Sequence, residues 1–296
     1  VLSPTRHALV IGAGLAGAAV CAALSRRGWS TTLIDEASGP AHGASALPVG
    51  MLSPHVTRAP TPLSRLSALG VTDMRRQLES RIAPGAGWQP CEVDNLGHDP
   101  GRWPAALVRP AALVQAWLDE ARAGLHLREC WNAPVARLQA VGGGAGSGGW
   151  QALAADGRAL AEAPVAVVAS AYGSQALLAA TAQLDREALP LHPVQGQMSL
   201  AALDGEPLAP RPLRNNGVFV PCYEDTGLPP QWPARVWAMG STYERGQISC
   251  ALSEAAHGRN AQSLEAIHPA AAQRLRTALE QERLLGWAQV RCASLD

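Results

Sequence analysis

The sequence contains no lysine, and all 24 of its basic residues are arginines. Schiff-base chemistry and general-base catalysis by a lysine of this chain are therefore excluded. Charged residues make up only 16% of the chain, and the formal net charge is zero. The strongly basic composition that would by itself indicate a nucleic-acid partner is absent. Recognition of an anion would have to rest on particular arginines, which stay protonated and pair well with carboxylates and phosphates.

Long hydrophobic runs are absent as well. No apolar stretch reaches the roughly 20 residues that a helix needs to cross a bilayer. The first residues, Val1–His7, also lack an apolar targeting core. We therefore expect a cytoplasmic protein without a membrane partner.

Cysteine is sparse and scattered. None of the six cysteines stands in a Cys-x-x-Cys pair, the spacing that is typical of zinc sites and redox motifs. The pattern predicts reduced core or surface thiols, with neither a disulfide framework nor a metal site.

The length of 296 residues exceeds what one compact core of ordinary size holds. Together with a content of 47% hydrophobic residues, it indicates a folded globular protein with two domains. The chain starts at Val1 rather than at a methionine, and it stops at Asp296 directly after a strand-like segment. Both ends indicate a fragment of a larger polypeptide.

The N-terminal segment predicts one β-α-β unit. His7–Ile11 is a short apolar run typical of a buried strand, and Leu15–Arg27 carries small and apolar residues at helical spacing. Gly28 ends this helix, and Thr31–Ile34 follows as a second strand. The resulting length of about 30 residues is usual for such a unit.

A glycine-rich turn, G-x-G-x-x-G, joins the first strand to the helix at Gly12, Gly14 and Gly17. The first glycine permits the tight turn, the second lets a pyrophosphate approach the helix N-terminus, and the third lets the helix pack against the strand. Asp35, with Glu36 as the alternative, follows the second strand, where a carboxylate binds ribose hydroxyls. The context predicts a dinucleotide site but does not separate FAD from NAD. Its expected residues are Gly12, Ala13, Gly14, Leu15, Ala16, Gly17, Asp35 and Glu36.

Beyond this unit, strand-like and helical segments follow one another. Gly39–Pro54, rich in small residues and proline, predicts a loop that lets the backbone approach a ligand. Pro62–Ile82 and Pro110–Arg122 predict helices, and Gly142–Gly149 predicts a turn. Further strands are expected at Leu125–Arg137, Trp150–Ala155, Val165–Ala169, His192–Leu200, Gly217–Pro221, Val236–Ser241 and Ala288–Cys292, and a helical stretch over Ser253–Leu285 is expected to break near His268-Pro269.

Several of these segments resemble the D-amino-acid oxidase-type FAD oxidoreductases, along nearly the whole chain. Gly43-Ala-Ser45 and Gly50-Met-Leu-Ser-Pro54 resemble the small-residue loop beneath the flavin in that family. Val167–Gly173 resembles the strand and glycine turn that closes over FAD, and Val135 stands where the family contacts adenine through its backbone. The resemblance implies FAD as the cofactor. It adds Gly43, Ala44, Ser45, Gly50, Met51, Val135, Ala169 and Gly173 to the expected cofactor site.

The same resemblance implies an α/β fold, α+β overall, in which a Rossmann-like FAD-binding domain is interleaved with a mixed-sheet substrate domain. The expected limits are residues 1–54, 104–194 and 288–296 for the FAD-binding domain, and residues 55–103 and 195–287 for the substrate domain. Two departures stand out. Ala46-Leu47-Pro48 follows Ser45, where the family usually continues with Gly-Asn. The family also continues past Asp296, so the fold is expected to be truncated at its C-terminus.

Within that family, four segments resemble the oxidoreductase half of the bifunctional tRNA 5-methylaminomethyl-2-thiouridine biosynthesis proteins. They are Gly43–Ser45, His192–Gln197, Gly240–Arg245 and Val290–Ala293. In those bacterial proteins this half follows a methyltransferase domain. The resemblance implies tRNA as the substrate and a fused or associated methyltransferase domain as a partner.

The implied reaction oxidises the carboxymethylaminomethyl group of a wobble uridine. The C–H next to the secondary amine passes a hydride to the flavin, and the imine hydrolyses to a primary amine and glyoxylate. The substrate carboxylate stays charged, and the planar fork of an arginine is suited to hold it. Arg291 stands where glycine-oxidising relatives place such an arginine, with a surface ion pair as the alternative role. Tyr243 is expected to line the substrate cavity, with core packing as the alternative.

For other side chains near these segments, the sequence gives weaker support for a functional role. Arg214 and Arg245 are candidates for contact with tRNA phosphate, although solvated surface arginines are the commoner case. Cys292 is expected to be an inert buried thiol. His42 and His55, which flank the flavin loop, are expected to be solvated.

Two other functions remain open. One is an oxidase of a free amino acid such as glycine or sarcosine, which would perform the same reaction with a different access to the flavin. The other is a truncated chain that keeps the fold, holds FAD loosely or not at all, and is not an enzyme. The visible absorption spectrum of the purified protein separates the second from both enzymes.

Overall fold

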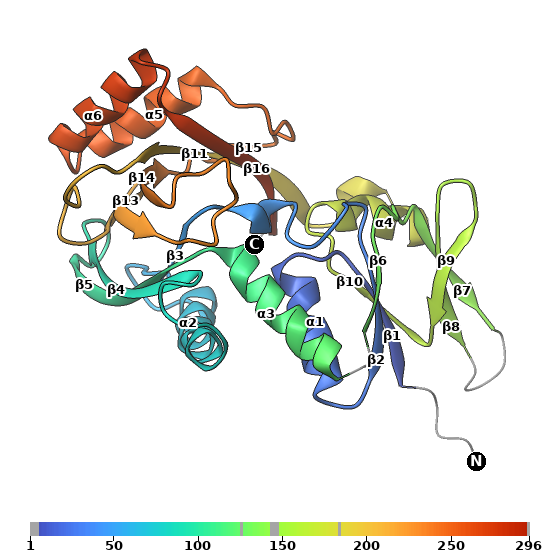
Figure 1. Cartoon of the computed structure of the whole chain (residues 1–296). Coiled ribbons are helices and arrows are strands. Elements are labelled where there is room, and N and C mark those ends of the chain that lie inside the picture. The colour runs from blue at the N-terminus through green and yellow to red at the C-terminus, as the bar shows by residue number, and fades with distance from the viewer. Residues whose placement is uncertain (1–5, 125–126, 143–147, 183–184, 295–296) are drawn as a thin grey trace. The chain divides into compact units, whose positions relative to one another are not determined.

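The computed structural model describes residues 6–124, 127–142, 148–182 and 185–294 (Figure 1). The chain divides into two compact units, each built from separate stretches of sequence. Unit 1 comprises residues 1–46, 114–193 and 291–296, and unit 2 comprises residues 47–113 and 194–290. Unit 1 contains the predicted β-α-β segment.

Unit 1 is built around a four-stranded parallel sheet. The elements of this layer are β1 (His7–Ile11), α1 (Leu15–Ser25), β2 (Ser30–Ile34), β6 (Leu127–Cys130) and β10 (Val165–Val168). The strand order is β10-β1-β2-β6, so β1 has neighbours on both sides. This enclosed position explains why β1 is continuously apolar rather than alternating. The predicted β-α-β unit is confirmed, with the helix ending at Ser25 rather than at Arg27.

A second, antiparallel sheet in unit 1 has the order β7-β8-β9. The remaining elements are α3 (Pro110–Ala123, which begins in unit 2), β7 (Arg137–Val141), β8 (Gly149–Leu153), β9 (Ala159–Ala163) and α4 (Gly173–Ala182), with 3-10 turns at Ala44–Ala46 and Arg186–Ala188. One hydrophobic cluster joins both sheets and α4, and includes Leu9, Ile34, Leu138, Ala152 and Leu177. The parallel sheet is therefore anchored to the antiparallel sheet through a shared core.

Unit 2 is built on a nine-stranded mixed sheet. Its strands are β3 (Gly50–Leu52), β4 (Trp88–Asn95), β5 (Gly101–Val108), β11 (Leu191–Ala202), β12 (Leu213–Asn215), β13 (Gly217–Glu224), β14 (Arg235–Gly240), β15 (Glu244–Arg245) and β16 (Leu285–Ser294). The order is β15-β11-β14-β13-β12-β4-β5-β3, and β16 pairs with β11. Strand β12 runs parallel to β4, while the other pairs along this order are antiparallel.

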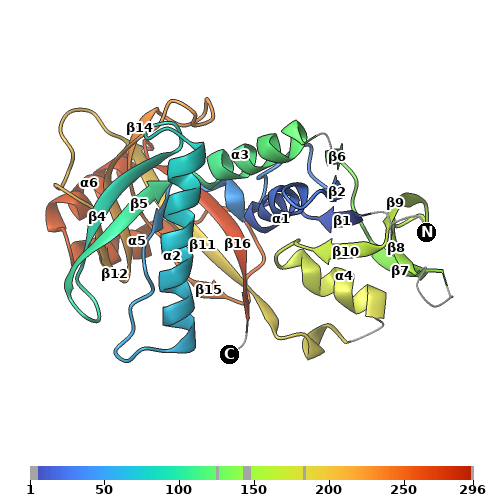
Figure 2. The ribbon, with the colours of Figure 1, turned by 90° about the horizontal axis from the view of Figure 1, so that it is seen from below.

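Three helices accompany this sheet: α2 (Pro62–Arg81), α5 (Glu254–Glu265) and α6 (Pro269–Glu280). Helices α5 and α6 cover one face, where Phe219 and Trp237 of the sheet pack against Leu264 and Leu275 (Figure 1). The view from below shows the length of α2 (Figure 2). A capping box with Thr61 starts α2: Thr61 Oγ1 accepts from the Ser64 N–H, and Ser64 Oγ accepts from the Thr61 N–H.

Two sequence predictions are wrong. The strand expected over Leu125–Arg137 ends at Cys130 within the described residues, because Asn132 turns the chain with φ 52° before β7 begins. The loop expected over Gly39–Pro54 contains β3, whose Met51 pairs with Leu107. The first error concerns a local turn, and the second concerns a strand partner far away in sequence. Most of the turn expected at Gly142–Gly149 lies outside the described residues.

Several elements went unpredicted. Strand β4 pairs with β5 along its whole length, although Pro90 and four acidic or amide side chains make its sequence unlike that of a typical strand. Helix α4 begins at Gly173, the last residue of the predicted glycine turn, and no element was predicted for the rest of the helix. The long helical stretch does break near the expected place: α5 ends at Glu265, and α6 begins at Pro269 with His268 as its N-cap.

Among the helices of the described residues, none combines the length and the hydropathy needed to cross a membrane.

Candidate functional site

The turn between β1 and α1 in unit 1 leaves no room for side chains at two of its glycines. Gly12 has φ +107°, and a Cβ there would lie 2.5 Å from the carbonyl oxygen of Ala169. A Cβ on Gly17 would lie 1.8 Å from the carbonyl oxygen of Gly12. Gly12 therefore lets the turn pass the end of β10, and Gly17 lets α1 approach β1, as the motif predicts.

Asp35 connects the end of β2 to this turn. Its Oδ2 accepts a hydrogen bond from the Ala13 N–H at 2.6 Å, and its Oδ1 accepts one from the Ala37 N–H at 2.8 Å. The carboxylate is half-buried, whereas the neighbouring Glu36 is exposed. Asp35 is thus fixed beside the glycine turn, at the place where ribose hydroxyls need an acceptor.

The N-terminus of α1 is open to a ligand. Gly14 is its N-cap residue and makes no side-chain cap, and the first turn carries no acidic residue. Leu15 and Ala16 are exposed, and the Leu15 N–H donates to Ser45 Oγ at 3.1 Å. Backbone N–H groups and the helix dipole together favour an anion at this end. The site therefore suits a phosphate-containing ligand.

A family model described as FAD dependent oxidoreductase matches the chain over residues 7–107 and 102–296. This chain belongs to that family. The predicted resemblance to D-amino-acid oxidase-type FAD oxidoreductases is therefore confirmed, and FAD is the cofactor.

Curated relatives of this FAD dependent oxidoreductase share one name. The tRNA 5-methylaminomethyl-2-thiouridine biosynthesis bifunctional protein MnmC of Paracidovorax citrulli is 37% identical, over 97% of this chain and 50% of the relative. The protein of the same name from Polaromonas naphthalenivorans is 34% identical, over 99% of this chain and 51% of the relative. The chain spans about half the length of the curated relatives it matches.

Solved structures confirm the predicted fold. Glycine oxidase from Geobacillus kaustophilus matches 98% of this chain and 84% of its own, with a TM-score of 0.71 and 17% identity. At this identity the likeness concerns the fold alone.

The glycine turn fits FAD. A Cβ on Gly14 would lie 3.1 Å from Ser45 Oγ, so the absence of a side chain keeps the space between turn and loop open. Ser45 supplies a hydroxyl and Asp35 a carboxylate next to the exposed helix end. An open helix N-terminus with an adjacent acid is the donor and acceptor set that a dinucleotide needs. Bound FAD supplies the two-electron acceptor.

The other predicted cofactor residues are spread over both units. In unit 1, Ala169 follows β10 and donates its N–H to the Ile11 carbonyl at 2.7 Å, next to Gly12. Val135 lies after β6, with its side chain against the unit-1 core, and exposed Gly173 begins α4. Unit 1 also contains Glu36, Gly43, Ala44, Val135 and Gly173, and unit 2 contains Gly50 and Met51. Their contact with FAD stays a prediction.

The two predicted substrate residues are both exposed. Arg291 lies in β16, and Tyr243 has 55% of its surface accessible. The core-packing alternative for Tyr243 is therefore wrong. The guanidinium carbon of Arg245 lies 5.8 Å from the centre of the Tyr243 ring, a cation–π distance.

Arg214 is half-buried, although a solvated surface arginine was the commoner expectation. Its Nε donates to Asn95 Oδ1 at 3.0 Å, and its Nη1 donates to Ser53 Oγ at 2.7 Å and to the Pro54 carbonyl at 2.8 Å. Burial lowers the pKa of this guanidinium. Arg245 and His42 are exposed, as expected, while Cys292 is half-buried and burial raises the pKa of its thiol.

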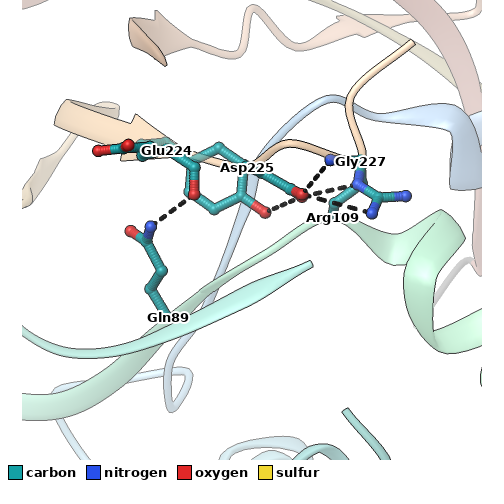
Figure 3. A network of polar contacts seen from close by, with 6 residues as sticks. Gln89, Arg109, Glu224, Asp225 and Gly227 are labelled. Carbon is teal, nitrogen blue, oxygen red and sulfur yellow. Dashed lines mark hydrogen bonds and ion pairs between the residues drawn. The ribbon is translucent and has the colours of Figure 1, made fainter. Parts of the chain in front are cut away.

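A buried network in unit 2 went unpredicted (Figure 3). Asp225, whose side chain is fully buried, accepts from Arg109 Nε at 2.7 Å and from the Tyr223 hydroxyl at 2.8 Å. Its other oxygen accepts from the Gly227 N–H at 2.8 Å. Arg109 and Asp225 are far apart in sequence, so no local pattern signals their pairing. The network fixes the start of the β13–β14 loop and belongs to the scaffold.

Proposed function

We propose that this chain is the FAD-dependent oxidase half of a tRNA-modifying protein, and that it removes the carboxymethyl group from carboxymethylaminomethyluridine at the wobble position. The observation that carries the proposal is the alignment of almost the whole chain with the bifunctional proteins named above, at 37% and 34% identity. On this proposal the glycine turn of unit 1 binds FAD, Arg291 and Tyr243 contact the substrate, and the protein works in the cytoplasm.

The proposed reaction breaks one C–N bond after a two-electron oxidation. The methylene carbon between the secondary amine and the carboxylate loses a hydride, and the nitrogen loses a proton, which leaves a carbon–nitrogen double bond. Water adds to this bond, and the product separates into the primary amine on the uridine and glyoxylate. The residues of the chain have to hold the carboxylate and orient the methylene group.

Arg291 is the residue proposed to hold the carboxylate. A guanidinium forms two parallel charge-assisted hydrogen bonds with a carboxylate, which fixes its orientation as well as its charge. Arg291 is exposed in β16 and can be reached from solvent. Tyr243, also exposed, is proposed to contact the substrate.

A methyltransferase domain is the proposed partner. The relatives are called bifunctional, and this chain accounts for about half of their length. A primary amine is the product of the proposed reaction, and amine methylation is a reaction that consumes it. The partner would then act directly after this chain.

The test supplies the FAD-loaded protein with tRNA that carries carboxymethylaminomethyluridine, and with glycine or sarcosine in parallel. We expect glyoxylate to be released from the tRNA, and mass spectrometry of the digested RNA should show the primary amine. Oxidation of glycine or sarcosine without reaction of the tRNA would contradict the proposal and favour a free amino-acid oxidase. Protein without a yellow chromophore would contradict both.

Arg291→Ala tests the carboxylate contact. Loss of a charge-assisted hydrogen bond should lower kcat/KM for the RNA substrate about 10- to 150-fold. FAD content should stay unchanged, and Arg291→Lys should restore only part of the activity, since an ammonium lacks the planar fork. Arg158→Ala is the matched control, because it removes an arginine that is 68% exposed and lies 3.9 Å from its acidic neighbour. Equal activity in Arg291→Ala and Arg158→Ala would assign the carboxylate to another residue.

A further inference from the structure

Unit 2 contains a cavity of about 420 Å³, and its lining includes Arg214, one of the two arginines that the sequence analysis named as candidates for contact with tRNA phosphate. It lies where the loop after β3, the β4–β5 turn and the β12–β13 turn meet, and its polar lining comes from His55, Asn95, His98, Arg214, Asn215 and Asn216. Its volume falls in the range of roughly 300–1,000 Å³ that small-molecule sites occupy. The cavity is therefore large enough for a ligand rather than for water alone.

Arg214 is held at this cavity in one orientation. Three acceptors on Ser53, Pro54 and Asn95 bind its Nε and Nη1. Within the part of the chain that the structure describes, Nη2 has no protein acceptor. Ordering a long side chain in this way costs conformational entropy, and partial burial of the charge adds a desolvation cost. A ligand oxyanion that accepts from the remaining N–H donors of Arg214 would compensate for both the entropic cost and the desolvation cost.

Asn95 is the residue that positions Arg214. This buried amide donates both hydrogens to the carbonyl oxygens of His98 and Asp99, at 2.6 and 3.0 Å. Its own carbonyl oxygen accepts from Arg214. One side chain thus fixes the β4–β5 turn and the arginine together. His98, carried by that turn, is presented to the same cavity.

The charge at the cavity has one sign. Among the described residues that line it, none is acidic, and Arg214 carries a permanent positive charge. Asp94, which precedes Asn95, is already paired with Arg102 at 3.0 Å and Arg211 at 3.4 Å. The cavity accordingly favours an anion over a cation.

The lining also suits a nucleoside. Exposed imidazoles at His55 and His98 offer faces on which an unstacked base can stack, and the amides of Asn215 and Asn216 can hydrogen-bond base edges. We infer that this cavity binds one phosphate of the RNA strand, through Arg214, together with the attached nucleoside. This inference rests on the proposed tRNA substrate and adds a second contact site to it.

Gly97 allows a test that leaves Arg214 and its partners in place. A Cβ on Gly97 would lie 3.7 Å from Asn215 Oδ1 and 3.9 Å from Asn95 Oδ1, which are ordinary contacts. Gly97→Glu therefore brings a negative charge to the cavity, and Gly97→Gln brings the same bulk without charge. The matched control is Gly258→Glu, on the exposed side of α5, where a Cβ meets nothing within 4 Å.

The experiment measures binding of a synthetic anticodon stem-loop RNA to the FAD-loaded protein, and compares kcat/KM for this RNA with kcat/KM for the free modified nucleoside. Gly97→Glu should weaken RNA binding about 10-fold or more relative to Gly97→Gln, and should lower the ratio of the two kcat/KM values by a similar factor. Gly258→Glu should bind the RNA within about 2-fold of wild type, because screening weakens a remote surface charge.

Four outcomes would overturn the inference in distinguishable ways. Equal RNA binding by wild type and both Gly97 variants would show that the RNA does not enter the cavity, while the proposed function stands. Equal loss in Gly97→Glu and Gly97→Gln would place an uncharged part of the RNA there. A matching loss with the free nucleoside would assign the cavity to the substrate carboxylate instead of a phosphate. Wild-type protein that binds no RNA would remove the proposed function and this inference together.

Discussion

The three glycines of the first turn differ in what a side chain would meet. At Gly17 the Cβ would lie 1.8 Å from a backbone oxygen, and at Gly12 it would lie 2.5 Å from one. At Gly14 it would lie 3.1 Å from a serine hydroxyl, which can give way by a few tenths of an ångström. The fold therefore requires Gly12 and Gly17, whereas we expect Gly14 to be required for ligand binding.

We therefore expect Gly14→Val and Gly17→Ala to fail differently. Gly14→Val should keep the circular dichroism spectrum and lose FAD, because the branched side chain fills the approach to the helix N-terminus. Gly17→Ala should lower the thermal midpoint of the protein, because α1 can no longer approach β1. This is an effect on the fold and not on the FAD contact. Absorption at the flavin bands and thermal denaturation measure the two effects separately.

Gly70→Ala serves as the control for both substitutions, because a Cβ at this position in α2 meets nothing within 4 Å. This variant should keep both FAD and stability. Normal flavin content in Gly14→Val would show that the phosphates bind elsewhere.

At the scale of elements, the β13–β14 loop depends on one buried carboxylate. Asp225 binds Arg109, the residue before α3, and Tyr223 near the end of β13, and the Arg109 side chain is only 15% exposed (Figure 3). Burial and the nearby carboxylate raise the pKa of Tyr223 well above its ordinary value, so its hydroxyl stays a donor. The network links a helix to a strand through charges that water does not screen.

Asp225→Asn should destabilise unit 2 by about 3–5 kcal/mol, the usual effect of leaving one charge of a buried pair without its partner. Urea unfolding followed by tryptophan fluorescence measures the change. The matched control is Asp156→Asn, which removes an acid from a pair whose side chains are both 68% exposed. That change should cost less than about 1 kcal/mol. Similar losses in the two variants would mean that the buried pair is not what anchors the loop.

For the molecule as a whole, one buried and one half-buried histidine make stability depend on pH. His257 is 6% exposed, and its Nδ1 lies 2.7 Å from Ser199 Oγ, which also accepts from Asn260. Burial lowers the pKa of His257, and Glu254 opposes this shift only in part. The pKa of His7 is lowered as well, by burial and then by Arg128. The folded protein therefore resists protonation at both sites.

The sign of the effect follows from linkage. Below a pH of about 6.5 the unfolded chain binds protons that folded His257 and His7 do not, so the free energy of unfolding falls with pH and levels off below the folded pKa values. We expect the thermal midpoint to drop between about pH 7.5 and pH 5.5, and to drop less in His257→Gln. Comparing the two pH values within each variant removes the constant effect of the substitution. An equal drop in both proteins would contradict a role for His257.

The sequence by itself determined the first unit and its chemistry. The G-x-G-x-x-G turn, the flanking apolar strands and the acid after the second strand are local features, and local sterics dictate what they form. The confirmed family and cofactor followed from these residues together with the small-residue segments. Proline positions also placed helix starts correctly, as at Pro62 and Pro269, because a proline at the first turn lacks only an N–H that would be unpaired anyway.

Only the tertiary structure decided which distant residues meet. Strands β3 and β4 form because they pair with β5. No pattern in their own sequences predicts this pairing. The Arg109–Asp225 pair and the hydrogen bond between Arg214 and Asn95 join segments more than a hundred residues apart. A side chain becomes a buried charge only when other elements exclude water from it. Arg214 read as a surface residue in the sequence for that reason. Periodicity and motifs report local structure, whereas desolvation is a property of the assembled fold.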